Sequence, residues 1–176
     1  MSQFNKIMIF IDGSNVFHGC KKLKFLISYE KFITLLRKDR NVMRVVFYTG
    51  IKPGQEEMSL LKLLKRIDVK VVTKLLKIRN FKCKSCDSSI QTFTEKGIDA
   101  SMSTDLLWFA IQGGYDIAII VSGDADFIPV VKRISSLGKK IELWTFKHMA
   151  GKELKEKVDK TLYIDDIISD ITLERT

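Results

Sequence analysis

The chain has 176 residues, 45% hydrophobic and 29% charged, which is typical of a globular domain and excludes a disordered chain. No apolar run approaches the roughly 18 residues that span a bilayer, and the first residues lack a secretion signal, so we expect a cytoplasmic protein with no membrane partner. The net charge of +9 favours a polyanionic partner, most simply nucleic acid, although a merely lysine-rich surface also accounts for it.

The first part of the chain alternates short apolar runs with amphipathic segments. The apolar runs predict strands buried on both faces, and the amphipathic segments predict helices between them. The expected elements are, in order, a strand at Lys6–Ile11, helical stretches at Val16–Cys20 and Tyr29–Arg37, a strand at Arg44–Tyr48, a helix at Gln55–Ile67 and a strand at Val69–Thr73.

The segment at about 74–95 is polar and basic, and its alternating apolar residues predict a small antiparallel hairpin inserted into a crossover. Regular alternation then resumes, so we expect one doubly wound α/β domain over residues 1–176 with a mainly parallel, Rossmann-like sheet. The remaining expected elements are a helix at Gly97–Gln112, a strand at Ile117–Val121, a helix at about Asp126–Leu137, a strand at Lys140–Thr145, a helix around Lys152–Lys157 and a short helix from about Asp165.

Acidic residues stand where two of the predicted strands end. Asp12 follows the first strand, and Asp124 and Asp126 follow the strand at Ile117–Val121. The carboxyl ends of parallel strands form the ligand crevice of such sheets, so these carboxylates are expected to meet. A hard cation such as Mg²⁺ or Mn²⁺ would relieve their repulsion, which makes a metal-dependent phosphodiesterase our first hypothesis.

Each acid also has a purely structural explanation. The segment from Asp12 to Asn15 reads as a tight turn in which Ser14 or Asn15 caps the next helix. Asp126 reads as the N-cap of the helix that contains Pro129, and this leaves Asp124 without an explanation.

Asp99 lies in the first turn of its predicted helix, within the apolar arc that includes Ile98 and Met102. A buried carboxylate costs several kcal/mol unless it is paired, and a metal shared with Asp12 would pair it. Asp105 lies about 120° around the same helix, either at the rim of the pocket or on the surface.

Four motifs then occur in order: IDGSN after the first strand, EKGID at Glu95–Asp99, TDLL at Thr104–Leu107 and VSGDADFIP at Val121–Pro129. Together they resemble the NYN domain, in its LabA-like branch of the PIN-like nuclease superfamily. The resemblance covers residues 6–165, and its closing part is Leu154–Asp165, an apolar helix followed by K-x-x-Y-I-D.

This resemblance implies a three-layer α/β/α fold and a Mg²⁺- or Mn²⁺-dependent ribonuclease. It implies metal binding by Asp12, Asp99 and Asp124, with Asp126 or Asp105 orienting the attacking water. The resemblance also makes Asn15 and Ser122 hydrogen-bonding residues of the same pocket. PIN-like sites often contain a further acid after the second strand, where this chain has FYTGIKPG, so the number of metals stays open.

The Cys83–Cys86 pair forms a C-x-x-C within the predicted hairpin, half of a structural Zn²⁺ site. A two-fold homodimer would supply four such ligands, or Cys20 and His18 would complete the set; the alternative is two reduced cysteines. Basic and aromatic residues near the predicted pocket favour RNA contact over a solvated surface. The basic residues expected to contact RNA are Lys21, Lys22, Lys77, Arg79 and Lys82.

Several other classes compete with the ribonuclease. A haloacid dehalogenase phosphatase needs an acid where Ser14 stands, and a receiver domain needs one where Thr73 and Lys74 stand, so both are disfavoured. A catalytically weak RNA- or metal-binding regulatory module of the same fold stays open, as does a dimeric interaction protein organised by the C-x-x-C.

Overall fold

The computed structural model describes residues 5–55, 58–82, 89–94 and 96–174, with side chains 79–91 left out of the description. Its centre is a six-stranded sheet in the order β3-β2-β1-β6-β7-β8, in which every neighbouring pair is parallel. The strands are β1 (Ile7–Asp12), β2 (Val42–Ile51), β3 (Lys70–Leu75), β6 (Ile117–Val121), β7 (Lys140–Thr145) and β8 (Lys160–Tyr163).

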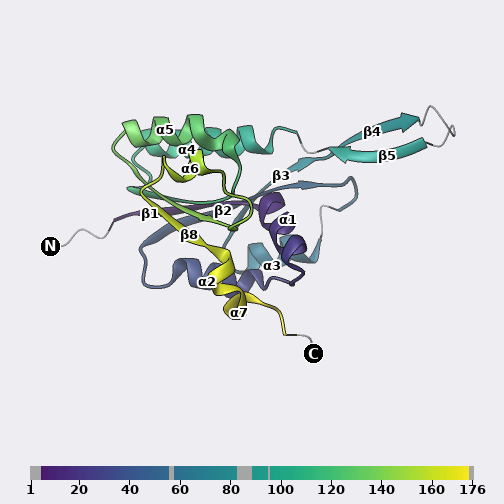
Figure 1. Ribbon diagram of the computed structural model, residues 1–176, viewed down its shortest axis with the longest axis horizontal. Helices are drawn as coiled ribbons and strands as arrows, with labels where there is room; N and C mark the ends of the chain where they lie inside the picture. The colour runs from purple at the N-terminus through teal and green to yellow at the C-terminus, as the bar shows by residue number, and fades with distance from the viewer. Residues whose placement is uncertain (1–4, 56–57, 83–88, 95, 175–176) are drawn as a thin grey trace.

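Helices cover both faces of this sheet (Figure 1). One hydrophobic cluster packs α1, α2, α3 and α7 against one face, and a second packs α4, α5 and α6 against the other, so the α/β sandwich has three layers. The helices are α1 (Gly13–Leu23), α2 (Tyr29–Arg37), α3 (Ser59–Arg66), α4 (Ile98–Ile111), α5 (Ile128–Ser136), α6 (Lys152–Lys155) and α7 (Ile168–Ile171), with 3-10 turns η1 (Ala125–Phe127) and η2 (Ile164–Ile167).

The strand order creates a switch point between β1 and β6. The chain runs outward from β1 through β2 to β3, and then returns to place β6 on the other side of β1. Ligand crevices of open parallel sheets form at such points, outside the carboxyl ends of the strands. The residues that follow β1 and β6 therefore occupy the position expected of a functional site.

The segment between β3 and α4 forms a separate two-stranded ribbon. Strands β4 (Lys77–Lys82) and β5 (Ser89–Thr94) pair antiparallel, as the alternating pattern predicts, and project from the sheet in Figure 1. Lys74 belongs to β3 and not to the ribbon, which corrects the predicted boundary. Cys83 and Cys86 lie outside the described residues.

Most predicted elements are confirmed, and β6 and β7 have the predicted bounds. The prediction missed β8, because KTLY is short and carries no continuous apolar run. The predicted helix from Gln55 begins only at Ser59, after Met58. Among the described residues, each helix is too short or too polar to span a bilayer.

Candidate active site

Asp12 is the last residue of β1 and is only 5% exposed. Its carboxylate accepts two hydrogen bonds: Oδ1 from the backbone N–H of Asn15 over 3.0 Å, and Oδ2 from the hydroxyl of Ser122 over 2.9 Å. The first bond makes Asp12 the N-cap of α1, where we had expected Ser14 or Asn15. Asp12 therefore connects β1, α1 and the end of β6.

Ser122 follows β6 and is 1% exposed. Its Oγ donates to Asp12 and also accepts from the backbone N–H of Asp124 over 3.2 Å. A second link runs beside it, since the Gly123 backbone N–H donates to Asn15 Oδ1 over 3.0 Å. The first turn of α1 and the loop after β6 are therefore held together by hydrogen bonds at the switch point, and the expected role of Asn15 and Ser122 as hydrogen-bonding residues has a geometric basis.

Two glycines at this edge pack closely against neighbouring parts of the structure. A Cβ on Gly13 would lie 2.5 Å from the ring of Phe47, and a Cβ on Gly123 would lie 2.9 Å from both Thr145 Oγ1 and Met149. Such distances are too short for real carbon contacts, so a larger residue at Gly13 would push the start of α1 away from β2, and one at Gly123 would push the loop after β6 away from Thr145 and Met149.

Asp124, and not Asp126, caps the helical turn that follows β6. Asp124, half-buried, is the N-cap of the 3-10 turn η1, and its Oδ1 accepts from the backbone N–H of Asp126 over 2.9 Å. Asp126 is exposed within the turn. The prediction that Asp126 caps a helix was wrong because the chain turns once as a 3-10 helix before α5 begins at Ile128.

Asp105 is brought to this edge of the sheet by Tyr48. Tyr48 pairs with Asp12 in the β1–β2 register and is fully buried. Its hydroxyl donates to Asp105 Oδ2 over 2.8 Å. Burial, together with the hydrogen bond to Asp105 and the charge of that carboxylate, raises the pKa of Tyr48 well above its usual range, so the tyrosine stays a donor. Asp105 is therefore half-buried beside Tyr48, while its place at the rim of a metal pocket stays a prediction.

Asp99 is exposed in the first turn of α4, and our prediction of a buried carboxylate was wrong. The buried face of α4 follows the spacing of Ile98 and Met102, so Asp99 lies just outside it. The helix dipole favours an acid at this position. The structure adds a cation nearby: Lys74 Nζ lies 3.2 Å from where a Cβ on Gly97, the N-cap of α4, would stand.

Within the described residues, no three His, Cys, Asp or Glu side chains are close enough to hold a metal ion. The candidate donors at this edge are carboxylate oxygens: Asp12 accepts from the Ser122 hydroxyl, and Asp124, whose backbone N–H donates to the same hydroxyl, follows Ser122 by two residues. Mg²⁺ in nucleic-acid enzymes uses one or two carboxylates and completes its shell with water and substrate phosphate. The donor set therefore fits a site that substrate completes, and it does not fit a cage made by the protein alone.

The predicted RNA-contacting residues are only partly described. Lys21 and Lys22 are exposed on α1, the helix that Asp12 caps, and Lys77 is exposed on β4. The side chains of Arg79 and Lys82 lie outside the described part of the structure.

Sequence reasoning missed two residues of this edge. Tyr48 was treated only as the end of an apolar strand, and Thr145, 1% exposed beside Gly123, as the end of another. Both carry a hydroxyl on the last predicted residue of an apolar run, in RVVFY and IELWT. A polar atom at the carboxyl end of a parallel strand is the signal that would have found them.

Comparison with known proteins agrees with this geometry. The NYN domain model matches residues 6–165. The chain is 25% identical over 167 residues to the low amplitude and bright protein LabA of Synechococcus elongatus, covering 94% of this chain and 87% of that protein. A crystal structure of a protein of unknown function from Vibrio parahaemolyticus shares the fold, with a TM-score of 0.77 and 22% identity over 98% of this chain and 99% of that one. The chain belongs to the NYN domain family.

Proposed function

We propose that this protein is a ribonuclease that hydrolyses RNA phosphodiester bonds with Mg²⁺ or Mn²⁺ at the carboxyl-end edge of β1 and β6. The observation that carries the proposal is the hydrogen-bonded unit of Asp12, Ser122 and Asp124 at the switch point of the sheet. Membership of the NYN family and the net charge of +9 support a nucleic-acid substrate.

In this proposal Asp12 and Asp124 hold the cation, and Asp99 joins them from the start of α4. The bound cation supplies Lewis-acid stabilisation of the phosphate charge and lowers the pKa of a bound water. Ser122 keeps the Asp12 carboxylate in one orientation, because its hydroxyl donates to Oδ2 over 2.9 Å. This preorganisation lowers the cost of arranging the ligands when substrate arrives.

Two further groups act on the substrate in this proposal. Asp105, held by the Tyr48 hydroxyl at 2.8 Å, orients the attacking water. Asp126 is the alternative for that role, since it is exposed two residues after Asp124. Lys74, beside the N-cap of α4, attracts the phosphate and offsets the repulsion between RNA and the acids.

The test is cleavage of end-labelled single-stranded RNA by purified protein in Mn²⁺, Mg²⁺ or EDTA, beside Asp12→Asn and Asp99→Asn. The Asn at position 12 keeps an oxygen that accepts from Asn15, so the N-cap survives while the charge is lost. Cleavage that needs metal and is lost in both variants supports the proposal. Equal cleavage by wild type and variants would identify a contaminating nuclease.

A second candidate is an RNA-binding regulatory module without useful turnover. It is favoured by one observation: Asp12 and Asp124 both cap local structure, so both have a structural reason to be present. This candidate predicts that RNA is retained but uncut in both metals. Zinc binding by Cys83 and Cys86 and a homodimer built on them remain separate predictions, which metal analysis and native mass spectrometry test.

A further inference from the structure

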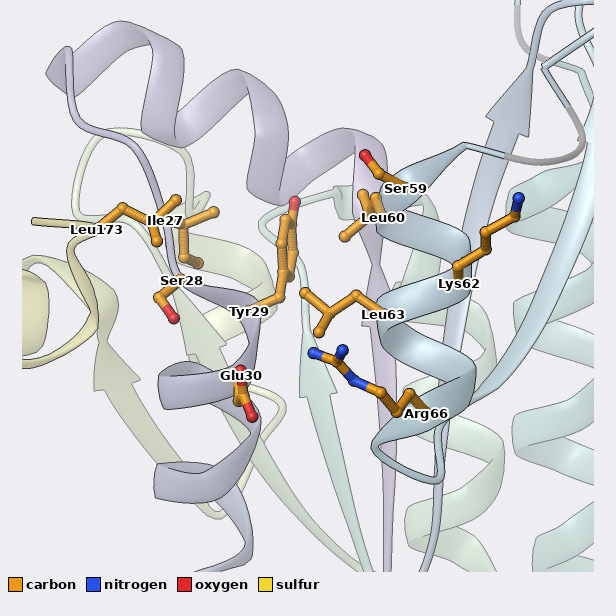
Figure 2. Close-up of a pocket in the computed structure, with 10 residues that line it drawn as sticks. All are labelled: Ile27, Ser28, Tyr29, Glu30, Ser59, Leu60, Lys62, Leu63, Arg66 and Leu173. Carbon is orange, nitrogen blue, oxygen red and sulfur yellow. The ribbon is translucent and has the colours of Figure 1, made fainter. Parts of the chain in front are cut away.

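An apolar groove with basic edges lies on the face of the molecule covered by α1, α2 and α3. Two adjoining cavities of about 580 and 650 Å³ form it, and they share four lining residues. The shared residues are Ile27, Tyr29, Leu60 and Leu173. In Figure 2, Tyr29 stands between the side chains of α3 and those of Ile27 and Leu173. We call this the α1–α3 groove; the acids described above do not line it.

The groove begins close to the proposed active site. Asp12 caps α1, Phe17 and Lys21 lie four residues apart on one stripe of that helix, and Lys24 is its left-handed C-cap. All three line the larger cavity. Phe17 lies about 6 Å along the helix from Gly13, at the rise of an α-helix. The larger cavity therefore begins about one helical turn from the residue that follows Asp12.

The groove combines aromatic faces with positive charge. Phe17 is 58% exposed, and Phe25 and Tyr29 line the groove behind it. Arg66 extends toward the groove from α3, whereas Lys62 extends to the other side of that helix (Figure 2). Lys21, Lys24 and Arg66 thus give both walls a positive edge, against one acid, Glu30, among the residues lining the two cavities.

We infer that the α1–α3 groove binds the unpaired bases of single-stranded RNA that flank the scissile bond. Aromatic side chains next to cationic ones are the combination that binds single strands without reading sequence, because bases stack and phosphates pair with the cations. The cavity volume, about 650 Å³, is that of a small-molecule site and accepts a nucleotide. The inference rests on the proposed function for its choice of RNA as the occupant.

The test is binding without catalysis. Fluorescence anisotropy in EDTA measures the affinity of labelled single-stranded RNA of about 10 nucleotides, within the length that such surfaces cover. Phe17→Ala should weaken binding about 5- to 150-fold, the effect of losing one base–aromatic stack. Lys21→Gln should lower the slope of log affinity against log salt by about 0.7.

Matched controls separate the groove from general charge. Lys38 is exposed at the end of α2 but lines neither cavity, so Lys38→Gln removes the same charge outside the groove. Leu23 is an exposed apolar residue that lines neither cavity, so Leu23→Ala is the control for Phe17→Ala. Equal effects of Lys21→Gln and Lys38→Gln, or of Phe17→Ala and Leu23→Ala, overturn the inference, and so does wild-type protein that binds no RNA. Cross-linking of 4-thiouridine RNA should reach Phe17, Phe25 or Tyr29, and cross-links confined to other surfaces overturn it too.

The outcomes distinguish the groove from the nuclease. Groove-dependent binding by a protein that does not cleave keeps this inference and rejects the ribonuclease. Metal-dependent cleavage that Phe17→Ala and Lys21→Gln leave unchanged, with unchanged binding, keeps the ribonuclease and rejects the groove.

Discussion

Replacement of Ser122 by alanine removes the hydroxyl that links Asp12, at the end of β1, to the loop after β6. That hydroxyl donates to Asp12 over 2.9 Å and accepts from the Asp124 backbone over 3.2 Å, and Ser122 is 1% exposed. A hydrogen bond to a charged group contributes about 1.5–3 kcal/mol, and a buried N–H left without its partner adds a desolvation cost of about 1–3 kcal/mol. Water replaces part of the second loss, because Asp124 is half-buried. We therefore expect Ser122→Ala to lower the free energy of unfolding by about 2–4 kcal/mol.

Urea unfolding followed by circular dichroism measures this change. For a chain of this size, each kcal/mol of lost stability lowers the Tm by about 2–4 °C. The Tm of Ser122→Ala should therefore lie roughly 4–16 °C below that of wild type. Ser135→Ala is the matched control: Ser135 is exposed on α5, and its substitution should stay within about 0.5 kcal/mol of wild type. If Ser122→Ala were as stable as Ser135→Ala, the hydroxyl would not be holding Asp12 to the loop after β6. The Asp12 carboxylate would then not be preorganised by Ser122.

Three further predictions concern other parts of the fold. Gly19→Ala should destabilise the protein by about 1–3 kcal/mol or more, because the new Cβ would lie 2.1 Å from the ring of Phe146; wild-type stability in urea would contradict this close packing. Tyr48→Phe should lower the free energy of unfolding by about 1 kcal/mol and should slow RNA cleavage without changing the circular dichroism spectrum. An unchanged cleavage rate would show that Tyr48 does not position a carboxylate needed for cleavage. Burial raises the pKa of Cys20 from 9.0 to about 12 and that of Tyr115 above its usual range, so the folded state keeps protons that the unfolded state has lost. Stability should therefore be complete below about pH 9 and fall as the pH rises toward 12, and a flat stability profile from pH 8 to 11 would contradict it.

The sheet was largely predictable because its strands are buried on both faces. Continuous apolar runs such as Ile117–Val121 and Lys140–Thr145 leave little choice of element, and both strands have their predicted bounds. The edge strand β8 was not predictable in this way, since Lys160–Tyr163 is only partly buried. The helix from Gly97 was predicted well at both ends, because glycines bracket it.

The site was predictable as a place but not as a set of contacts. The position of Asp12 and Asp124 at strand ends was enough to place them at one edge of the sheet. The spacing of apolar residues in α4 suggested that Asp99 faces inward, but a helical wheel has no information on where the covered part of the helix stops. The bond from Tyr48 to Asp105 joins residues 57 positions apart, and it depends on how α4 packs against β2 in the folded chain.

The central claim is that a divalent cation at the Asp12 edge contacts the RNA phosphate that is cleaved. The most direct measurement is cleavage of an RNA that carries one phosphorothioate at the mapped cleavage site, in Mg²⁺ and in Mn²⁺. Sulfur is a poor ligand for Mg²⁺ and a better one for softer metals. We predict that the substitution slows cleavage in Mg²⁺, that Mn²⁺ restores the rate, and that Asp12→Asn shows no restoration. Equal slowing in both metals, or cleavage that persists in EDTA, would contradict a metal-bound phosphate at this site.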